Sequence, residues 1–204
     1  MIYGIILAAG EAKRMGEVKL TLPLGDKKII EWVLLAVKFA PLDKYYLVVR
    51  PTDEEIIEIG KKWGAKIIVN PEYKTGMSSS IRKAITKISP ENLEGFFIIL
   101  ADQPFINSSL FYKMLKLFTP GQREIIVPFY QEQPRNPVFF DGYWRDELLK
   151  ISGDVGGKTL IKANPEKIKR FKVNQEYVFF DIDVQKDYEE AKAIFTFLHK
   201  KGKI

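Results

Sequence analysis

The stretch IYGIILAAGEAKRMGEVK, residues 2–19, places a glycine-containing, cationic loop directly after an apolar run. The run IYGIIL is short and rich in β-branched residues, which is typical of a buried strand. Three small residues come directly after this run, namely Ala8, Ala9 and Gly10. They let a ligand approach the backbone closely. Arg14 and Lys19 then place two cations along the loop, which suits several phosphate oxygens at once. The stretch therefore indicates a strand followed by a phosphate-binding loop.

Two common phosphate-binding signatures are missing from this loop. It lacks the spacing GxxxxGK followed by Ser or Thr, which disfavours a P-loop kinase or NTPase. It also lacks GxGxxG, the phosphate turn of the dinucleotide-binding fold. The loop therefore points to another class of phosphate-binding protein.

Apolar runs alternate with helical patterns along the chain. Short runs rich in β-branched and aromatic residues predict strands at residues 2–7, 45–49, 66–69, 96–100 and 124–129. Between these runs, apolar residues recur at helical spacing. Such alternation with short connections is typical of a parallel sheet covered by helices on both faces. We therefore predict a Rossmann-like α/β fold with a mostly parallel sheet.

The pattern changes after Gln131. A turn there leads into another strand, and a glycine-rich segment later opens a further helix. The runs at residues 167–173 and 177–182 predict two more strands, and residues 186–200 predict a closing helix. No repeat or long linker divides the chain, so a single domain over residues 1–204 is expected.

Composition excludes several classes of protein. The formal net charge is +6, but most lysines lie among glutamates, which is typical of a solvated surface and argues against a nucleic-acid partner. The chain has no cysteine, so it has no disulfide and no thiolate metal site. No apolar run approaches the roughly 20 residues that cross a membrane, so no membrane partner is expected. The missing export signal predicts a cytoplasmic location.

Carboxylates follow two of the predicted strands. Asp102 stands in LADQP, and Asp181 and Asp183 stand in FDIDVQKD, where a strand end would place both on one face. Ligands of parallel sheets bind beyond the carboxyl ends of the strands. Mg²⁺ prefers one or two carboxylates together with substrate phosphates. We expect Asp102 and Asp183 to supply such a pair if their segments meet at the cleft.

Six segments occur in an order that resembles a known family: LAAGEAKRMGEVKLTLPLGDK, NPEYKTGMSSSIRKAI, LADQPF, NPVFF, SGDVGGKTLI and DIDVQKDYEEA. Together they resemble the molybdenum cofactor cytidylyltransferases, within the wider MobA-like nucleotidyltransferases. The resemblance extends from about residue 5 to about residue 191, nearly the whole chain. It implies a single domain of the nucleotide-diphospho-sugar transferase type.

The resemblance also implies an activity: transfer of a nucleoside monophosphate, CMP from CTP, onto the phosphate of molybdopterin, with release of pyrophosphate. It implies Mg²⁺ or Mn²⁺ as cofactor, and a transient contact with a molybdoenzyme. Lys19 is expected to face solvent and, with Arg14, to stabilise charge on the reacting phosphates, while Asp102 and Asp183 hold the metal. The nucleotide would lie against Leu7, Ala8, Ala9, Gly10, Ser78, Ser79 and Ser80, one serine also capping a helix. The acceptor would meet Arg135, Asn136, Gly153, Asp154, Gly156 and Lys158.

Three positions depart from the family pattern: Ala12 replaces a serine, Pro134 replaces a glycine, and Lys158 stands where an arginine is usual. The cytidylyl branch resembles LAAG and the guanylyl branch LAGG, so Ala9 favours CTP over GTP. Two alternatives stay open: a nucleotidyltransferase for a sugar phosphate or alcohol phosphate, and a nucleotide-binding or cofactor-binding module without turnover.

Overall fold

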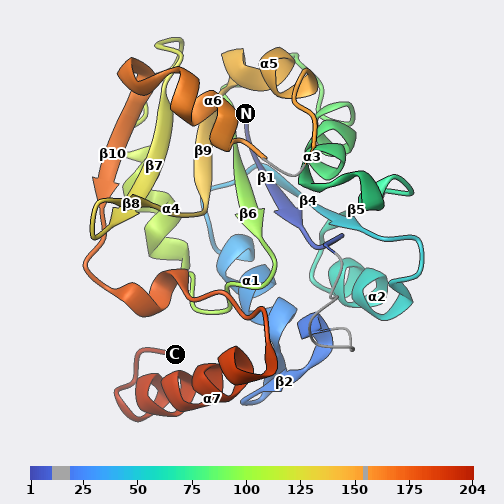
Figure 1. Cartoon of the computed structure of the whole chain (residues 1–204), viewed down its shortest axis with the longest axis vertical. Helices are drawn as coiled ribbons and strands as arrows, with labels where there is room; N and C mark the ends of the chain where they lie inside the picture. Colours follow the sequence, from blue (N-terminus) through green and yellow to red (C-terminus); the bar gives the residue numbers. More distant parts are fainter. Residues whose placement is uncertain (11–18, 154–155) are drawn as a thin grey trace.

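The computed structural model describes residues 1–10, 19–153 and 156–204. Its centre is an eight-stranded sheet in which seven strands follow the order β10-β7-β9-β6-β1-β4-β5, while β8 pairs with the carboxyl end of β7 (Figure 1). The strands are β1 (Ile2–Leu7), β4 (Lys44–Val49), β5 (Lys66–Val69), β6 (Gly95–Leu100), β7 (Ile125–Tyr130), β8 (Gln133–Pro134), β9 (Val138–Asp141) and β10 (Ile168–Lys172). A separate hairpin joins β2 (Pro23–Leu24) to β3 (Lys27–Lys28).

The sheet is mostly parallel, as the alternating sequence pattern predicts. Strand β1 pairs in parallel with β4 and β6, β4 with β5, and β7 with β10. Strand β9 is antiparallel to both of its neighbours, β6 and β7. The carboxyl ends of β1, β4 and β6 therefore lie at one edge of the sheet, where a ligand site is expected.

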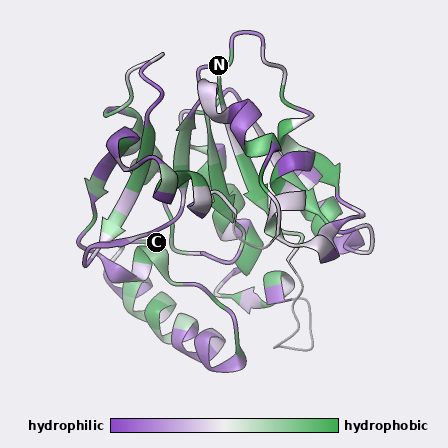
Figure 2. Ribbon diagram, turned by 45° about the horizontal axis from the view of Figure 1, so that its top comes forward, coloured by the Kyte–Doolittle hydropathy of each residue, from purple (hydrophilic) through white to green (hydrophobic). Residues whose placement is uncertain are grey.

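Helices cover both faces of the sheet and form two apolar cores (Figure 1). The helices are α1 (Ile29–Lys38), α2 (Glu54–Lys62), α3 (Met77–Ile85), α4 (Ser108–Leu115), α5 (Arg145–Leu149), α6 (Lys158–Ala163) and α7 (Gln185–Lys200). Helices α1, α2, α4 and α7 contribute to one core, and α3 and α5 to the other. Neighbouring strand residues alternate between them, so Ile6 belongs to the first core and Ile5 to the second. In Figure 2 the central strands are mostly green (hydrophobic), whereas the helices carry both green and purple (hydrophilic) residues.

The predicted strand at residues 177–182 is wrong. Glu176–Phe179 forms a 3₁₀ turn, and residues 180–183 have no regular structure. Val178, Phe179 and Ile182 are buried in the core beside α7 without pairing to a strand. A short apolar run shows that a segment is buried but does not show what buries it, which explains the error.

Helix α7 lies beside the β2–β3 hairpin (Figure 1). The Tyr188 hydroxyl donates a hydrogen bond of 2.5 Å to the carbonyl of Pro23, and Phe195 packs against Trp32. These contacts fix the segment that leads into α7, which carries Asp181 and Asp183. Within the described residues, no helix combines the length and apolarity needed to cross a lipid bilayer.

Candidate active site

A cavity of about 770 Å³ opens at the carboxyl ends of β1, β4 and β6. Residues from the end of β1, the 3₁₀ turn Tyr73–Thr75 and the start of α3 line it, together with the segments that follow β6 and precede α7. Ten of the residues predicted from the sequence lie in its wall: Leu7, Ala8, Ala9, Gly10, Lys19, Ser80, Asp102, Asn136, Lys158 and Asp183. Arg14, Ala12 and Asp154 lie outside the described residues.

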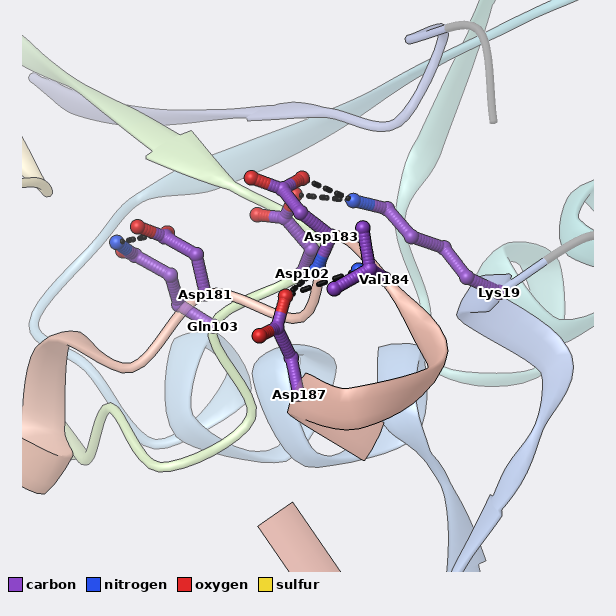
Figure 3. A network of polar contacts seen from close by, with 7 residues as sticks. All are labelled: Lys19, Asp102, Gln103, Asp181, Asp183, Val184 and Asp187. Atoms are coloured by element: carbon purple, nitrogen blue, oxygen red, sulfur yellow. Dashed lines mark hydrogen bonds and ion pairs between the residues drawn. The ribbon is translucent and has the colours of Figure 1, made fainter. Parts of the chain in front are cut away.

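Lys19 joins the two predicted metal carboxylates. Its ammonium donates to Asp102 Oδ2 at 2.8 Å and to Asp183 Oδ1 at 2.9 Å (Figure 3). Contrary to the expectation of a solvent-facing lysine, only 16% of its side chain is exposed. Burial by itself lowers the pKa of the Lys19 ammonium, but Asp102 and Asp183 outweigh this effect, and the pKa is raised. Lys19 is therefore a fixed positive charge at neutral pH.

Backbone contacts bring Asp102 and Asp183 together although 81 positions separate them in the sequence. The N–H of Ile182 donates to the carbonyl of Asp102 at 3.2 Å, and the Ile182 side chain is fully buried. The Asp187 carboxylate accepts from the N–H groups of Asp183 and Val184 at 2.8 and 2.9 Å (Figure 3). Asp187 therefore satisfies free donors at the start of α7 and holds the preceding segment in place.

Replacing Ile182 by Ala is expected to lower the free energy of unfolding by about 2–5 kcal/mol, because a fully buried side chain leaves a cavity behind. Urea denaturation followed by circular dichroism measures this change. Ile204→Ala is the matched control, because Ile204 is 39% exposed at the end of the chain, and we expect a change within about 0.5 kcal/mol. Equal effects in both variants would contradict the anchoring role of Ile182.

Asp181 lies near Asp102 and Asp183 but contacts a different residue, Gln103. Gln103 Nε2 donates to Asp181 Oδ1 at 2.7 Å (Figure 3). Asp181 is exposed to the cavity as a whole residue, but its carboxyl group is partly buried. This burial, followed by the negative charge of Asp102, raises the pKa of Asp181 to about 6. Asp181 therefore holds a proton more readily than an ordinary carboxyl. Its contact is with Gln103, whereas Asp102 and Asp183 share the contact with Lys19.

The carboxylates fit the small set of protein ligands that Mg²⁺ or Mn²⁺ uses. Asp102 Oδ1 and Gln103 Oε1 are buried acceptors without a hydrogen-bond partner among the described residues. An acceptor left this way is costly unless a cation, a water or a ligand completes it. The described residues contain no group of three or more acidic or imidazole ligands around one point. This arrangement is consistent with an ion that two carboxylates hold and substrate phosphates complete.

The three predicted serines differ in their surroundings. All are buried, but only Ser80 lines the cavity. Ser79 Oγ donates to the carbonyl of Gly76 at 2.8 Å, and Asn70 Nδ2 donates to Ser79 and Ser80 at 2.9 and 3.0 Å. The expected serine cap is wrong: Gly76 occupies the N-cap of α3, with φ of 102°. That angle lies in the left-handed region, which glycine adopts with little strain.

The predicted acceptor residues divide into two groups. Asn136 and Lys158 line the cavity, whereas Arg135, Gly153 and Gly156 are not part of its wall. The carbonyl of Gly153 accepts from the N–H of Ser78 at 3.2 Å, and Arg135 donates its backbone N–H to Pro128 at 2.8 Å. Gly153 and Arg135 therefore form backbone hydrogen bonds with segments near the cavity and do not line it.

The structure adds cavity residues to which no role was assigned from the sequence: Arg50, Tyr73, Lys74 and Thr75. Arg50 follows β4 directly, so the strand-end rule could have found it. Its guanidinium binds the buried Asp53 carboxylate, with Nη2 to Oδ1 at 2.6 Å and Nε to Oδ1 at 2.9 Å. Asp53 therefore fixes the guanidinium of Arg50 at the cavity wall.

Two curated proteins are similar to this chain over most of its length. The purine catabolism protein PucB of Bacillus subtilis (strain 168) is 27% identical over 172 residues, covering 79% of this chain and 81% of its own. The molybdenum cofactor cytidylyltransferase of Escherichia coli (strain K12) is 28% identical over 195 residues, covering 94% of this chain and 96% of its own.

A solved structure shares the fold, and a family model matches the sequence. The crystal structure of Rv0371c in complex with manganese, from Mycobacterium tuberculosis H37Rv, aligns with a TM-score of 0.79 at 23% identity, covering 94% of this chain and 98% of that one. The model of the MobA-like NTP transferase domain matches residues 4–168. The chain therefore belongs to the MobA-like NTP transferase domain family and is a nucleotidyltransferase.

Proposed function

We propose that the protein transfers CMP from CTP to the phosphate of molybdopterin and releases pyrophosphate, handing its product to a molybdoenzyme by transient contact. The observation that carries the proposal is the cluster of Lys19, Asp102 and Asp183, which shares one cavity with the LAAG backbone at residues 7–10. The similarity to the E. coli cytidylyltransferase supports this choice of donor and acceptor.

The reaction makes one bond and breaks one. An oxygen of the acceptor phosphate attacks the α-phosphorus of CTP, the bond to the bridging α–β oxygen breaks, and pyrophosphate leaves with that electron pair. A phosphate is already ionised at neutral pH, so no side chain has to remove a proton. Catalysis then rests on positioning and on neutralising charge.

Lys19 and Arg14 supply the cationic side chains for these phosphates. The Lys19 ammonium already lies in the cavity wall, 2.8 Å from Asp102 Oδ2. Asp102 and Asp183 would hold Mg²⁺ or Mn²⁺, which when bound neutralises charge on the triphosphate. A positioned group aimed at developing charge contributes roughly 10²–10³ in rate.

Ala9 gives the proposal a nucleotide preference. Ala9 is buried and lines the cavity. In the proposed complex its methyl group would narrow the space beside the base. One methyl in an apolar pocket discriminates by about 1–3 kcal/mol, so we expect CTP to bind roughly 10–200 times more tightly than GTP. Ala9→Gly should reduce that ratio.

Calorimetry with Mg²⁺ and each nucleotide measures the preference, with Ala8→Gly as the matched control at the neighbouring position. GTP binding as tightly as CTP, or a ratio that Ala9→Gly leaves unchanged, would contradict the CTP assignment. The nucleotidyltransferase assignment would stand in either case.

The acceptor is tested by pyrophosphate release with CTP and Mg²⁺. We expect release that depends on molybdopterin and that exceeds release with sugar phosphates or alcohol phosphates. A faster reaction with one of those phosphates would replace the proposed acceptor. No release with any acceptor, despite tight nucleotide binding, would favour a binding module without turnover.

A further inference from the structure

We propose that Lys19 competes with the divalent metal ion for its site. The Lys19 ammonium binds both Asp102 and Asp183 until the phosphates of a nucleotide accept its hydrogen bonds instead. A divalent cation would then bind strongly only together with the nucleotide. This inference rests on the proposed function in one respect, since a nucleoside triphosphate is the ligand that releases the lysine.

The contacts of Lys19 are the ones a metal ion would need. Its Nζ reaches Asp102 Oδ2 at 2.8 Å and Asp183 Oδ1 at 2.9 Å, so one nitrogen bridges both carboxylates (Figure 3). A divalent ion that binds the same two oxygens would lie within a few ångströms of the ammonium. Like charges at such a distance repel strongly in a partly buried site. The ammonium and the ion therefore compete for these oxygens.

A metal binds unfavourably while Lys19 keeps its place. Asp102 Oδ1 and Gln103 Oε1 have no hydrogen-bond partner among the described residues, and the second oxygen of Asp183 is not in the contact with Lys19. An ion bound by these atoms would still lie beside the ammonium, which holds one oxygen of each carboxylate. If phosphate oxygens accept the lysine's hydrogen bonds instead, Asp102 Oδ2 and Asp183 Oδ1 become available. The same phosphates then contribute further oxygens to the ion.

The lysine can move between the two partners without a change of fold. Its ammonium has three donors at the end of a flexible four-carbon stem, and Lys19 begins a 3₁₀ turn in the cavity wall. Arg50 differs, because the buried Asp53 holds its planar guanidinium. Lys158 also lines the cavity, but within the described part of the chain no ion pair joins it to Asp102 or Asp183.

Linkage makes the arrangement measurable. If the nucleotide removes a competitor of the metal, the metal must strengthen nucleotide binding by the same factor. Coupling between two sites commonly amounts to 5–150-fold in affinity. The predicted change in metal affinity depends on the Lys19 side chain, and a binding measurement detects it without turnover.

The test is a Mn²⁺ titration followed by electron paramagnetic resonance of the free ion, with no nucleotide present. We expect Lys19→Met to bind Mn²⁺ about tenfold more tightly than the unaltered protein, within the usual range of coupling. Lys158→Met removes the same charge from the same cavity, and we expect a change of roughly twofold or less, because a charge that contacts neither carboxylate is screened. Adding Asp102→Asn to Lys19→Met should abolish the gain.

The comparison overturns the inference if Lys19→Met binds Mn²⁺ no more tightly than the unaltered protein. A Lys158→Met variant that gains as much as Lys19→Met would also overturn it, because the effect would then be general electrostatics. Lys19→Gln, which retains a hydrogen-bond donor without the charge, is measured in parallel and should gain as Lys19→Met does. Thermal unfolding of each variant shows whether it is folded.

A second titration adds α,β-methylene CTP, which cannot transfer CMP. The triphosphate chelates Mn²⁺ equally in every variant. The difference in Mn²⁺ affinity between variants therefore reports the contribution of Lys19 alone. We expect the analogue to strengthen Mn²⁺ binding more in the unaltered protein than in Lys19→Met, and equal strengthening would contradict the release step. If the analogue does not bind at all, the nucleotide assignment fails, whereas the nucleotide-free comparison still decides whether Lys19 competes with the metal.

Discussion

Replacing Asp102 by Asn is expected to lower the rate of nucleotidyl transfer by about 10³-fold and to abolish the dependence of nucleotide binding on Mg²⁺. Asn has nearly the shape of Asp but carries no charge, so Lys19 loses one of its two ion pairs. On the proposed assignment the metal would also lose a ligand. Pyrophosphate release at increasing Mg²⁺ concentration measures the rate. Calorimetry with CTP, with and without Mg²⁺, measures the binding.

Asp181→Asn is the matched control for Asp102→Asn. Asp181 lies in the same cavity, but it contacts Gln103, and its pKa is already raised to about 6 by burial and by Asp102. We therefore expect a smaller loss at Asp181 than at Asp102 or Asp183. Equal losses at Asp181 and Asp183 would contradict the assignment of Asp183 as the metal carboxylate.

Replacing Lys19 by Ala is expected to lower turnover by about 10²–10³-fold while lowering the free energy of unfolding by about 1–3 kcal/mol. The large effect on turnover is expected because the proposed mechanism places the ammonium against the reacting phosphates. The effect on stability is limited because Asp183, with 56% of its side chain exposed, can be solvated once the lysine is removed, and it is not zero because Asp102 is only 21% exposed. Turnover is measured by pyrophosphate release and stability by urea denaturation.

Lys150→Ala serves as the control for the lysine variant. Lys150 also forms an ion pair, with Glu147 at 2.7 Å, but 68% of its side chain is exposed and it is not part of the cavity wall. Its loss should leave turnover unchanged. Near-normal turnover in Lys19→Ala would mean that the lysine does not contact the phosphates.

The sheet and the position of the site could be predicted because both depend on local pattern. Strands β1, β4, β5, β6 and β7 are short apolar runs separated by helical spacing, and the strand-end rule then selects the loop after β1 and Asp102 after β6. The position of β9 between β6 and β7 could not be predicted, because it depends on pairing between distant segments.

The details of the site depend on contacts that sequence spacing does not encode. Lys19 meets Asp102 across 83 positions and Asp183 across 164, and the bridge exists only once the segment before α7 returns to β6. The same segment was predicted to be a strand, because Val178, Phe179 and Ile182 are apolar. Their burial comes from the core beside α7, so the prediction identified the right residues and assigned them the wrong backbone.

The most direct test of the site is a crystal structure of the protein with Mn²⁺ and α,β-methylene CTP, in which anomalous scattering locates the ion. We predict a single Mn²⁺ peak in contact with Asp102, Asp183 and the triphosphate, with the Lys19 ammonium moved onto a phosphate. An ion bound away from Asp102 and Asp183, or a triphosphate outside the cavity at the carboxyl ends of β1, β4 and β6, would contradict the account.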